Sequence, residues 1–465
     1  MYARDLDWLA ARLPGALIRP GDAVYESARR VHNWAVDRRP ACIARCASAA
    51  GIAACVDFAR ENGLQLAVRG GGHHGAGLGA CEGGIVIDLS RMRRVEVNPH
   101  TRMARVEGGA TWGDVDRATH AFGLATPGAT VSTAGVGGVT TGGGVGHLTR
   151  RFGLSIDNLI AAEVVLSGGN IVTASAESNP DLFWAIRGGG GNFGVVSSFT
   201  FRLHPLPVVV AAQTLWPIER AGDVLRFYRD FIAAAPRELG GILSFYIAPR
   251  RPPIPERLHG RAVCGVTWCY SGPPDSFNGV FGPVRRVAKP EFELAGPMPF
   301  PVLQSLPGVL CPRGTRQFWR GALLAGLSET TLAIFEEHGT RLPTPLSSVR
   351  LFPIDGAAHG ARDEDTAFAG RKARWAVAVV AADSAPGSEQ RMAAWTASFS
   401  TALQEHSAGA YINFSGTGGS AAAAAYGENY SRLCALKLRF DPDNLFSNNH
   451  NIRPAPPRTT WTAAL

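Results

Sequence analysis

The hydrophobic pattern of residues 38–205 alternates short apolar runs with glycine-rich turns and two helical segments. From Ser48 to Asn62, apolar residues recur every three or four positions, which predicts a helix that begins behind the Ser48 hydroxyl. A second helix is predicted over 110–121. Apolar runs bounded by turn residues predict strands at 64–68, 85–88, 94–97, 105–107, 163–166, 171–174 and 195–203.

After residue 205 the pattern changes, because glycine becomes rarer and proline-rich loops separate longer apolar runs. We therefore predict a first domain over 1–205, a second α+β domain over 206–407 and a C-terminal segment over 408–465. The second domain is expected to contain strands at 242–247, 262–270, 347–351 and 375–382 and helices at 221–235 and 328–340. The C-terminal segment is expected to contain a helix at 426–440, a turn at 441–444 and an amide-rich end at 448–452.

Composition narrows the classes of function. The chain has 465 residues, 46% of them hydrophobic, and a formal charge of +8, but all except three of its 46 basic residues are arginines and no basic run is long. Nucleic-acid binding is therefore not expected, and neither is membrane insertion, because no apolar stretch reaches the length of a spanning helix. The eight cysteines form no CxxC pair, so we expect free thiols, a cytoplasmic location and no metal site.

The heptapeptide Arg69-Gly-Gly-Gly-His-His-Gly75 follows the predicted strand at 64–68. Consecutive glycines let backbone N–H groups approach an anion, and a histidine at the end of such a loop is placed to bond with the ligand. A tight turn followed by surface histidines is the alternative. The windows 70–75 and 189–194 both match G-x-G-x-x-G, but neither is followed by a helix, so a nicotinamide-binding Rossmann loop is not predicted.

The longest glycine cluster covers residues 135–146, where seven of twelve residues are glycine. Each glycine costs roughly 0.5–1 kcal/mol relative to alanine in a regular element. So many glycines indicate that backbone without side chains is needed in this segment. A long ligand lying along the backbone explains this need better than a flexible linker does. We therefore predict a ligand-binding segment here.

Taken together, these stretches resemble the berberine-bridge-enzyme/6-hydroxynicotine-oxidase branch of the FAD-linked oxidases, which carry the vanillyl-alcohol-oxidase (PCMH) type of FAD domain. The resemblance covers nearly the whole chain in the same order and is loosest over 206–407. It implies an α+β fold in which a PCMH-type domain of two subdomains binds FAD, an antiparallel sheet with helices faces the substrate, and residues 408–465 return to the FAD domain. The matching stretches are 38–46, 69–73, 135–146, 152–158, 179–194, 411–413, 441–446 and 451–452.

The resemblance also implies roles for single residues. His73 is at the position where the family bonds the flavin 8α-methyl group, and Val131 is where some members place a second, cysteinyl link, so a single covalent link is expected. His74 is either a residue that supports the site or a surface imidazole, and His450 stands where the family usually has glutamine. The residues implied to hold FAD are Arg69, Gly70, Gly71, Gly72, His73, His74, Val131, Gly135, Gly137, Gly138, Thr141, Gly142, Gly143, Gly146, Asp157, Val195, Val196, Asn413, Asn449 and Asn451.

The implied activity is hydride transfer from a small organic substrate to covalently bound FAD, with reoxidation by O2. Tyr411 is the candidate base. The partners expected are a small-molecule substrate and O2, in a monomer or a homodimer. An oxygenating tailoring enzyme of polyketide-like natural products, in which the flavin delivers oxygen, is the alternative activity, and a non-catalytic flavin carrier is the alternative class. A hydrolase is disfavoured because no Gly-x-Ser-x-Gly motif occurs.

Overall fold

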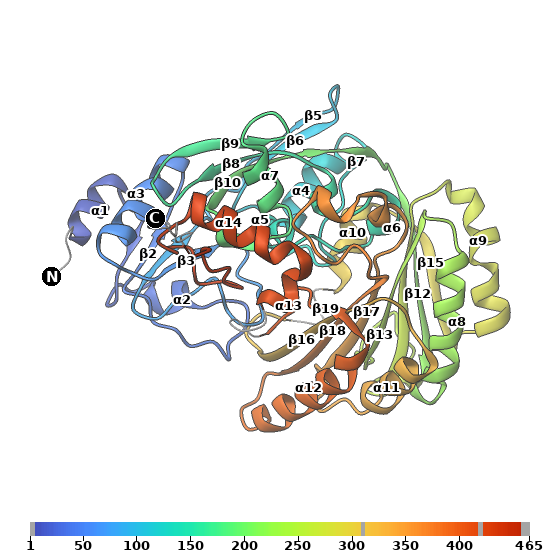
Figure 1. Ribbon diagram of the computed structural model, residues 1–465. Helices are drawn as coiled ribbons and strands as arrows, with labels where there is room; N and C mark the ends of the chain where they lie inside the picture. Colours follow the sequence, from blue (N-terminus) through green and yellow to red (C-terminus); the bar gives the residue numbers. More distant parts are fainter. Residues whose placement is uncertain (1–4, 308–311, 417–421, 457–465) are drawn as a thin grey trace, which may run out of the picture.

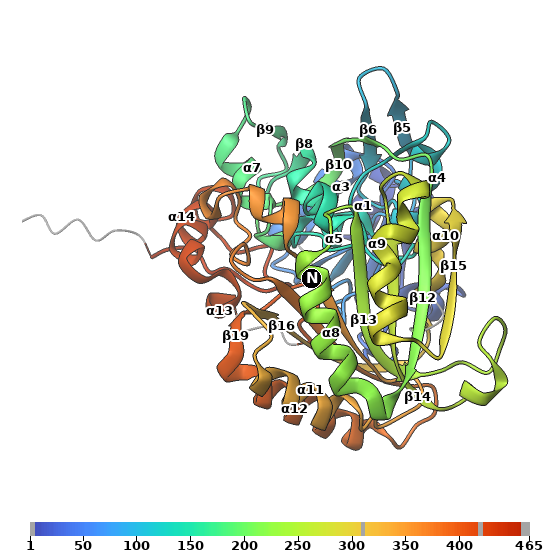
Figure 2. The ribbon, with the colours of Figure 1, turned by 90° about the vertical axis from the view of Figure 1, so that its right-hand side faces the viewer.

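The computed structural model describes residues 5–307, 312–416 and 422–456. Its strands form three main sheets, and Figures 1 and 2 show the largest of them beside the two smaller ones, with helices on its outer face. A two-stranded sheet, β7 (Leu124–Ala125) with β11 (His204–Pro205), lies at the point where the chain passes into the large sheet.

The smallest of the three sheets has the order β1-β2-β4-β3, with β2, β4 and β3 parallel and β1 antiparallel. The predicted helix at 48–62 is confirmed as α3, where the Ser48 hydroxyl accepts a hydrogen bond from the Gly51 N–H, and its apolar side packs on this sheet. The elements are α1 (Leu6–Arg12), β1 (Leu17–Ile18), α2 (Tyr25–Arg29), β2 (Cys42–Arg45), α3 (Ala49–Glu61), β3 (Leu66–Arg69) and β4 (Ile85–Asp88).

The second sheet is antiparallel, with the order β5-β6-β10-β8-β9. The predicted helix at 110–121 is confirmed as α4, whose N-terminus is closed by a capping box between Thr111 and Asp114. The elements are β5 (Val95–Asn98), β6 (Met103–Glu107), α4 (Trp112–His120), α5 (Val136–Thr141), α6 (Thr149–Phe152), β8 (Leu159–Val165), β9 (Ile171–Ser175), α7 (Pro180–Ile186) and β10 (Val195–Arg202).

The large sheet has eight strands in the order β15-β12-β14-β13-β17-β18-β16-β19, all antiparallel. It confirms the expected antiparallel sheet with helices. Its strands are β12 (Val209–Pro217), β13 (Leu239–Ile247), β14 (Ala262–Tyr270), β15 (Phe292–Met298), β16 (Arg316–Leu324), β17 (Ser348–Pro353), β18 (Trp375–Asp383) and β19 (Ser407–Gly409). The helices of this part are α8 (Ala221–Ala234), α9 (Phe277–Pro283), α10 (Phe300–Ser305), α11 (Glu329–Gly339) and α12 (Glu389–Leu403).

The two faces of the large sheet differ in what they contact. Side chains alternate along a strand, so Val349 and Leu351 of β17 pack in the core with the helices, whereas Arg350 and Phe352 face the opposite side. The same alternation on β18 sends Val377 towards the helices and its neighbours towards the smaller sheets. The inner face of the large sheet is therefore free to form one wall of a cavity.

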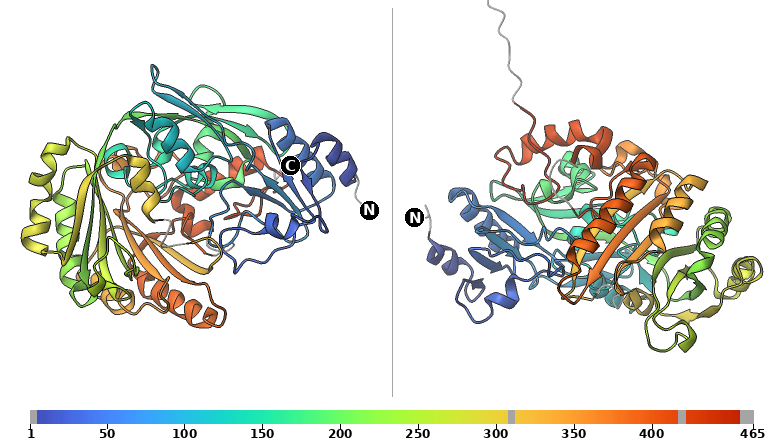
Figure 3. Two further views of the ribbon diagram at one scale, coloured as in Figure 1. Left: turned by 180° about the vertical axis from the view of Figure 1, so that it is seen from behind. Right: turned by 90° about the horizontal axis from the view of Figure 1, so that it is seen from below.

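The C-terminal segment runs back along the smaller sheets, as Figures 1 and 3 show. Helix α13 (Ala422–Tyr426) leads into α14 (Tyr430–Phe440), which packs against α7. The fully buried Lys437 side chain pairs with Asp441 at 2.6 Å and donates to the carbonyls of Asn192 and Phe446. This buried contact fixes the last turn of the chain beside the segment at 190–192. No helix among the residues described here is long and apolar enough to cross a membrane.

Candidate functional site

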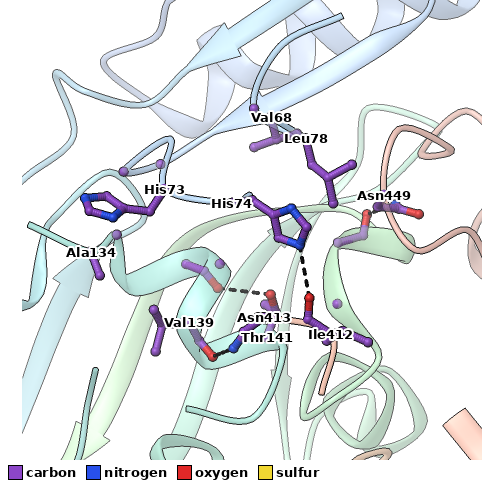
Figure 4. A pocket seen from close by; sticks show the side chains of 18 of the residues that line it. Val68, His73, His74, Leu78, Ala134, Val139, Thr141, Ile412, Asn413 and Asn449 are labelled. Carbon is purple, nitrogen blue, oxygen red and sulfur yellow. Dashed lines mark hydrogen bonds between the residues drawn. The ribbon is translucent and has the colours of Figure 1, made fainter. Parts of the chain in front are cut away.

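A cavity of about 290 Å³ lies where the three sheets meet. One side is made by the loop after β3, by α5 and by the start of β10, and the other by the inner face of the large sheet. The C-terminal segment closes it with residues 411–414 and 446–450. Figure 4 shows His73, His74, Val139, Asn413 and Asn449 converging on this space from these separate parts of the chain.

Two glycine runs cross at the base of the cavity. A Cβ atom added at Gly71 would lie 2.3 Å from the Gly135 nitrogen, and one added at Gly135 would lie 2.2 Å from the Gly71 nitrogen. Only glycine permits so close an approach of two backbones. Gly138 and Gly191 also line the cavity, and a Cβ at either would meet nothing within 4 Å. Bare main chain therefore faces open space, as a cradle for a long ligand requires.

His73 lies on the cavity wall immediately after the glycine loop. Its ring centroid is 4.0 Å from that of His32, and burial, followed by the charges of His32 and Arg313, lowers the pKa of His73 to about 3. Within the described part of the chain, neither of its ring nitrogens makes a hydrogen bond. The imidazole is therefore neutral near pH 7 and has a nitrogen lone pair to offer.

His74 is held quite differently. Its Nδ1 accepts from the Ala76 N–H at 3.1 Å, so the hydrogen-bond network assigns the ring proton to Nε2, which donates to the Ile412 carbonyl at 3.0 Å. His450 Nε2 lies 3.3 Å from His74 Nε2 and 3.1 Å from the same carbonyl. Burial lowers the pKa of His74 to about 4 and lowers that of His450 as well. Both histidines are neutral, and both ring nitrogens of His74 are occupied.

Tyr411 is fully buried, and three donors point at its hydroxyl oxygen. The backbone N–H groups of Gly144 and Val145 donate at 3.1 Å each, and the Asn413 side chain donates at 3.0 Å. Gly143 and Gly144 have φ values of +124° and +87°, a conformation that favours glycine and turns these N–H groups inward. Burial raises the pKa of Tyr411, and the three donors oppose that shift. Because these three groups all donate to the hydroxyl oxygen, the phenol proton of Tyr411 points away from them.

Asn449 presents an acceptor to the cavity. Its Nδ2 donates to the carbonyls of Gly191 and Phe446, while its Oδ1 is buried and has no partner among the described residues. A buried acceptor without a partner is costly, so it marks a place where a ligand donor fits. The arrangement of an N–H-rich cradle and a buried acceptor suits FAD, which has a diphosphate and a flavin ring N–H.

The structure brings most of the predicted FAD-contacting residues to this one cavity, and their contacts with FAD stay predictions. Gly70, Gly71, Gly72, His73, His74, Val131, Gly135, Gly137, Gly138, Thr141, Val195, Val196, Tyr411, Asn413 and Asn449 line the cavity. Arg69, Gly142, Gly143, Gly146, Asp157 and Asn451 lie outside that lining.

Two of these outlying residues bond to other parts of the protein instead. The Arg69 Nε donates to the Gly79 carbonyl at 2.9 Å beneath the glycine loop, and Asp157 accepts from Arg371 at 2.9 Å. The Arg69 contact joins two segments that carry lining residues, whereas Asp157 and Arg371 lie in segments without lining residues.

The sequence analysis did not identify the substrate-side wall. Tyr246, Trp268 and Tyr270 lie in the core of the second domain, and Arg320 is not part of the lining. The residues that the large sheet and the C-terminal segment contribute are Trp319, Arg350, Phe352, Ala378 and Phe414.

Comparisons with known proteins agree with this geometry. Residues 40–175 match the family described as FAD binding domain, and residues 410–453 match the family described as berberine and berberine like. An FAD-linked oxidoreductase from Dictyostelium discoideum is 29% identical over 95% of both chains. The (R)-6-hydroxynicotine oxidase of Paenarthrobacter nicotinovorans is 37% identical over 42% of this chain and 43% of its own.

The fold comparison extends over the whole molecule. The crystal structure of 6-hydroxy-D-nicotine oxidase from Arthrobacter nicotinovorans superposes with a TM-score of 0.83 at 26% identity, covering 95% of this chain and 98% of that one. Both family matches include residues of the cavity, and FAD is accordingly the cofactor. The chain is thus an FAD-linked oxidoreductase that matches the FAD binding domain over 40–175 and the berberine-like family over 410–453.

Proposed function

We propose that this enzyme oxidises a small organic molecule with FAD bonded through His73 and returns the electrons to O2. The observation that carries the proposal is the difference between two adjacent histidines. His73 is half-buried at the cavity wall, neutral and without a hydrogen bond among the described residues, whereas both nitrogens of His74 are engaged. Only a nitrogen with an available lone pair forms a new bond to carbon, so His73 is the nucleophile of this pair.

When bound, FAD supplies an acceptor for a hydride and its two electrons. The backbone of Gly71, Gly135 and Gly138 would hold its phosphates without intervening side chains, and the unpartnered Oδ1 of Asn449 would accept a hydrogen bond from the flavin ring. Tyr411 would exchange a proton with the substrate, because it lines the cavity and its three fixed donors stabilise the phenolate that forms when it gives up its proton.

The covalent link is tested by denaturing the purified protein in acid and measuring flavin absorbance in the precipitate. The wild-type protein is expected to keep its flavin in the pellet, and His73→Ala is expected to release all of it. His74→Ala is the matched control, since it removes the neighbouring imidazole and should leave the link intact. Flavin that remains bonded in His73→Ala refutes the assignment.

The electron acceptor is tested with a substrate found by screening for anaerobic bleaching of the flavin. We expect one H2O2 for each substrate oxidised, with no oxygen from O2 in the product. Incorporation of labelled oxygen from O2 into the product would instead support the oxygenating tailoring activity. A protein that binds FAD but is bleached by no donor in the screen would be a flavin carrier.

A further inference from the structure

A second histidine packs against His73. His32 is only 7% exposed and does not line the cavity, and its ring centroid lies 4.0 Å from that of His73 with 31° between the two ring planes. At this distance and tilt the faces of the two imidazoles meet. His32 therefore restricts how the His73 ring can turn about its side-chain bonds, and it does so where His73 has no hydrogen bond among the described residues.

The segment that carries His32 also holds the glycine loop in place. The His32 N–H donates to the Gly72 carbonyl at 3.0 Å. The next side chain, Asn33, donates through Nδ2 to the Gly75 carbonyl at 2.8 Å and to the Gln317 carbonyl at 2.9 Å. Its Oδ1 accepts from the Gln317 N–H at 2.9 Å. The loop is thus tied to strand β16 on both sides of its two histidines.

The Gln317 side chain determines which nitrogen of His32 carries the proton. The Trp319 indole can only donate, and it donates to Gln317 Oε1 at 2.9 Å, so the Nε2 group of Gln317 must be on the other side of the amide. That group donates to the Thr315 hydroxyl at 2.8 Å and lies 3.3 Å from His32 Nδ1, which accepts from it. A protonated His32 would turn an N–H towards this donor. The network therefore favours a neutral ring beside His73.

We infer that His32 is a positioning residue for the attachment of FAD, because it fixes the orientation of the His73 ring before the bond to the flavin forms. Reacting groups that are held in place react faster than groups that turn freely. The inference rests on the proposed function, since the link through His73 belongs to it. In forming that link, the 8α-methyl group and the imidazole each lose one proton, a carbon–nitrogen bond replaces the C–H and N–H bonds, and two electrons pass through the flavin ring to O2, which becomes H2O2 with the two protons.

The rate of attachment can be measured without knowing the substrate. Full-length apoprotein is purified from riboflavin-limited cells and mixed with FAD in air. Samples are precipitated in acid at intervals, and the flavin absorbance of the pellet gives the rate of covalent incorporation. This readout is independent of the activity of the loaded enzyme.

Variants of His32 separate the stacked ring from the space that it fills. His32→Leu fills similar space without a flat ring, and we expect it to incorporate flavin roughly 10- to 100-fold more slowly, the loss that a misplaced reacting group causes. His32→Phe keeps a flat ring against His73 and should restore most of the wild-type rate. His204→Leu is the matched control and should react at the wild-type rate, because His204 also stacks on a ring, that of Phe152 at 4.2 Å between centroids, but lies outside the cavity lining.

Two measurements distinguish orientation of His73 from folding and from cofactor binding. Thermal unfolding of each apoprotein reports its stability. In the His73→Ala background, where FAD is expected to bind reversibly, His32→Leu should leave the dissociation constant for FAD unchanged. A loss of affinity as large as the loss of rate would overturn the inference, because His32 would then serve binding.

The remaining outcomes separate this inference from the proposed function. A wild-type rate of incorporation in folded His32→Leu, or a rate in His32→Phe as low as in His32→Leu, overturns the positioning role and leaves the link through His73 standing. A wild-type protein that forms no covalent link, or forms it without His73, refutes the proposed function and this inference with it. If the His32 variants do not fold, Gln317→Leu decides: it removes the hydrogen bond to His32 and leaves both imidazoles, so it should slow incorporation, and an unchanged rate overturns the inference.

Discussion

Gly138→Ala separates a cofactor-binding role of the glycine cluster from a structural one. Gly138 lies inside α5, and an added Cβ would meet no atom within 4 Å, so the protein itself accommodates the methyl group. In a helix this exchange stabilises the folded state by about 0.5–1 kcal/mol. The same methyl group projects into the cavity, where we place the FAD phosphates. Crowding of a packed interface costs about 1–3 kcal/mol, which corresponds to roughly 5- to 150-fold weaker FAD binding.

The assay uses the His73→Ala background, in which FAD is expected to bind reversibly. Thermal unfolding of the cofactor-free protein reports the change in stability, and titration with FAD reports the affinity. Gly279→Ala is the matched control, because Gly279 also lies in a helix, α9, with nothing within 4 Å of an added Cβ, but it is remote from the cavity lining. We expect both variants to be at least as stable as the parent and only Gly138→Ala to lose affinity. Unchanged FAD affinity in Gly138→Ala would refute the view that this backbone faces the cofactor.

Three further predictions concern buried polar groups. Lys437→Met leaves the fully buried Asp441 carboxylate without its cation, so the free energy of unfolding should fall by about 3–5 kcal/mol, measured by urea denaturation. Burial lowers the pKa of His147 to about 4 in the folded state. As the pH falls below about 6.5, the His147 imidazole is therefore protonated in the unfolded state but still neutral in the folded state. Stability should therefore drop between pH 6.5 and 4, by about 3 kcal/mol from this residue. His147→Gln should flatten that slope in urea midpoints, and an unchanged slope would contradict the assignment. Asn413→Leu removes a donor that lowers the pKa of Tyr411, so the ascending limb of kcat/KM, which reports the essential base, should move to higher pH. A limb that stays in place would show that Tyr411 is not the group that titrates.

Local structure was predictable where one segment contains all the interactions that determine it. The helix beginning at Ser48 has its cap, its apolar side and its end within fifteen residues, and the strand at 85–88 was predicted with the bounds it has. The helix α5 was not predicted, because Val136–Thr141 contains two glycines and no amphipathic pattern. It forms because its first residues are bonded to neighbouring segments, as in the hydrogen bond from the Val136 N–H to the Ala110 carbonyl. Such long-range contacts leave no periodic signal.

The same limit explains why His73 was recognisable and its surroundings were not. The sequence identifies both glycine runs, at 69–75 and 135–146. It does not show that the backbones of Gly71 and Gly135 lie too close together for a Cβ atom between them, because that depends on how the two smaller sheets meet. Likewise, the contact between Tyr411 and the N–H groups of Gly144 and Val145 joins positions more than 260 residues apart. The family resemblance supplied Tyr411 as a candidate, whereas its three donors are visible only in the fold.

The substrate-side wall was missed for a different physical reason, and one signal for it was present. Strands β17 and β18 are buried on both faces, so alternation cannot say which face packs on helices and which faces a cavity. Arg350, however, interrupts the apolar run 349–353, and a predicted strand at 347–351 already contained it. Taking a guanidinium out of water is costly unless something polar meets it, so an arginine in the middle of a buried strand indicates that this face of the strand has polar surroundings. A charged residue in an otherwise apolar strand is thus a better guide to a substrate wall than the aromatic residues of neighbouring strands, which the core requires in any case.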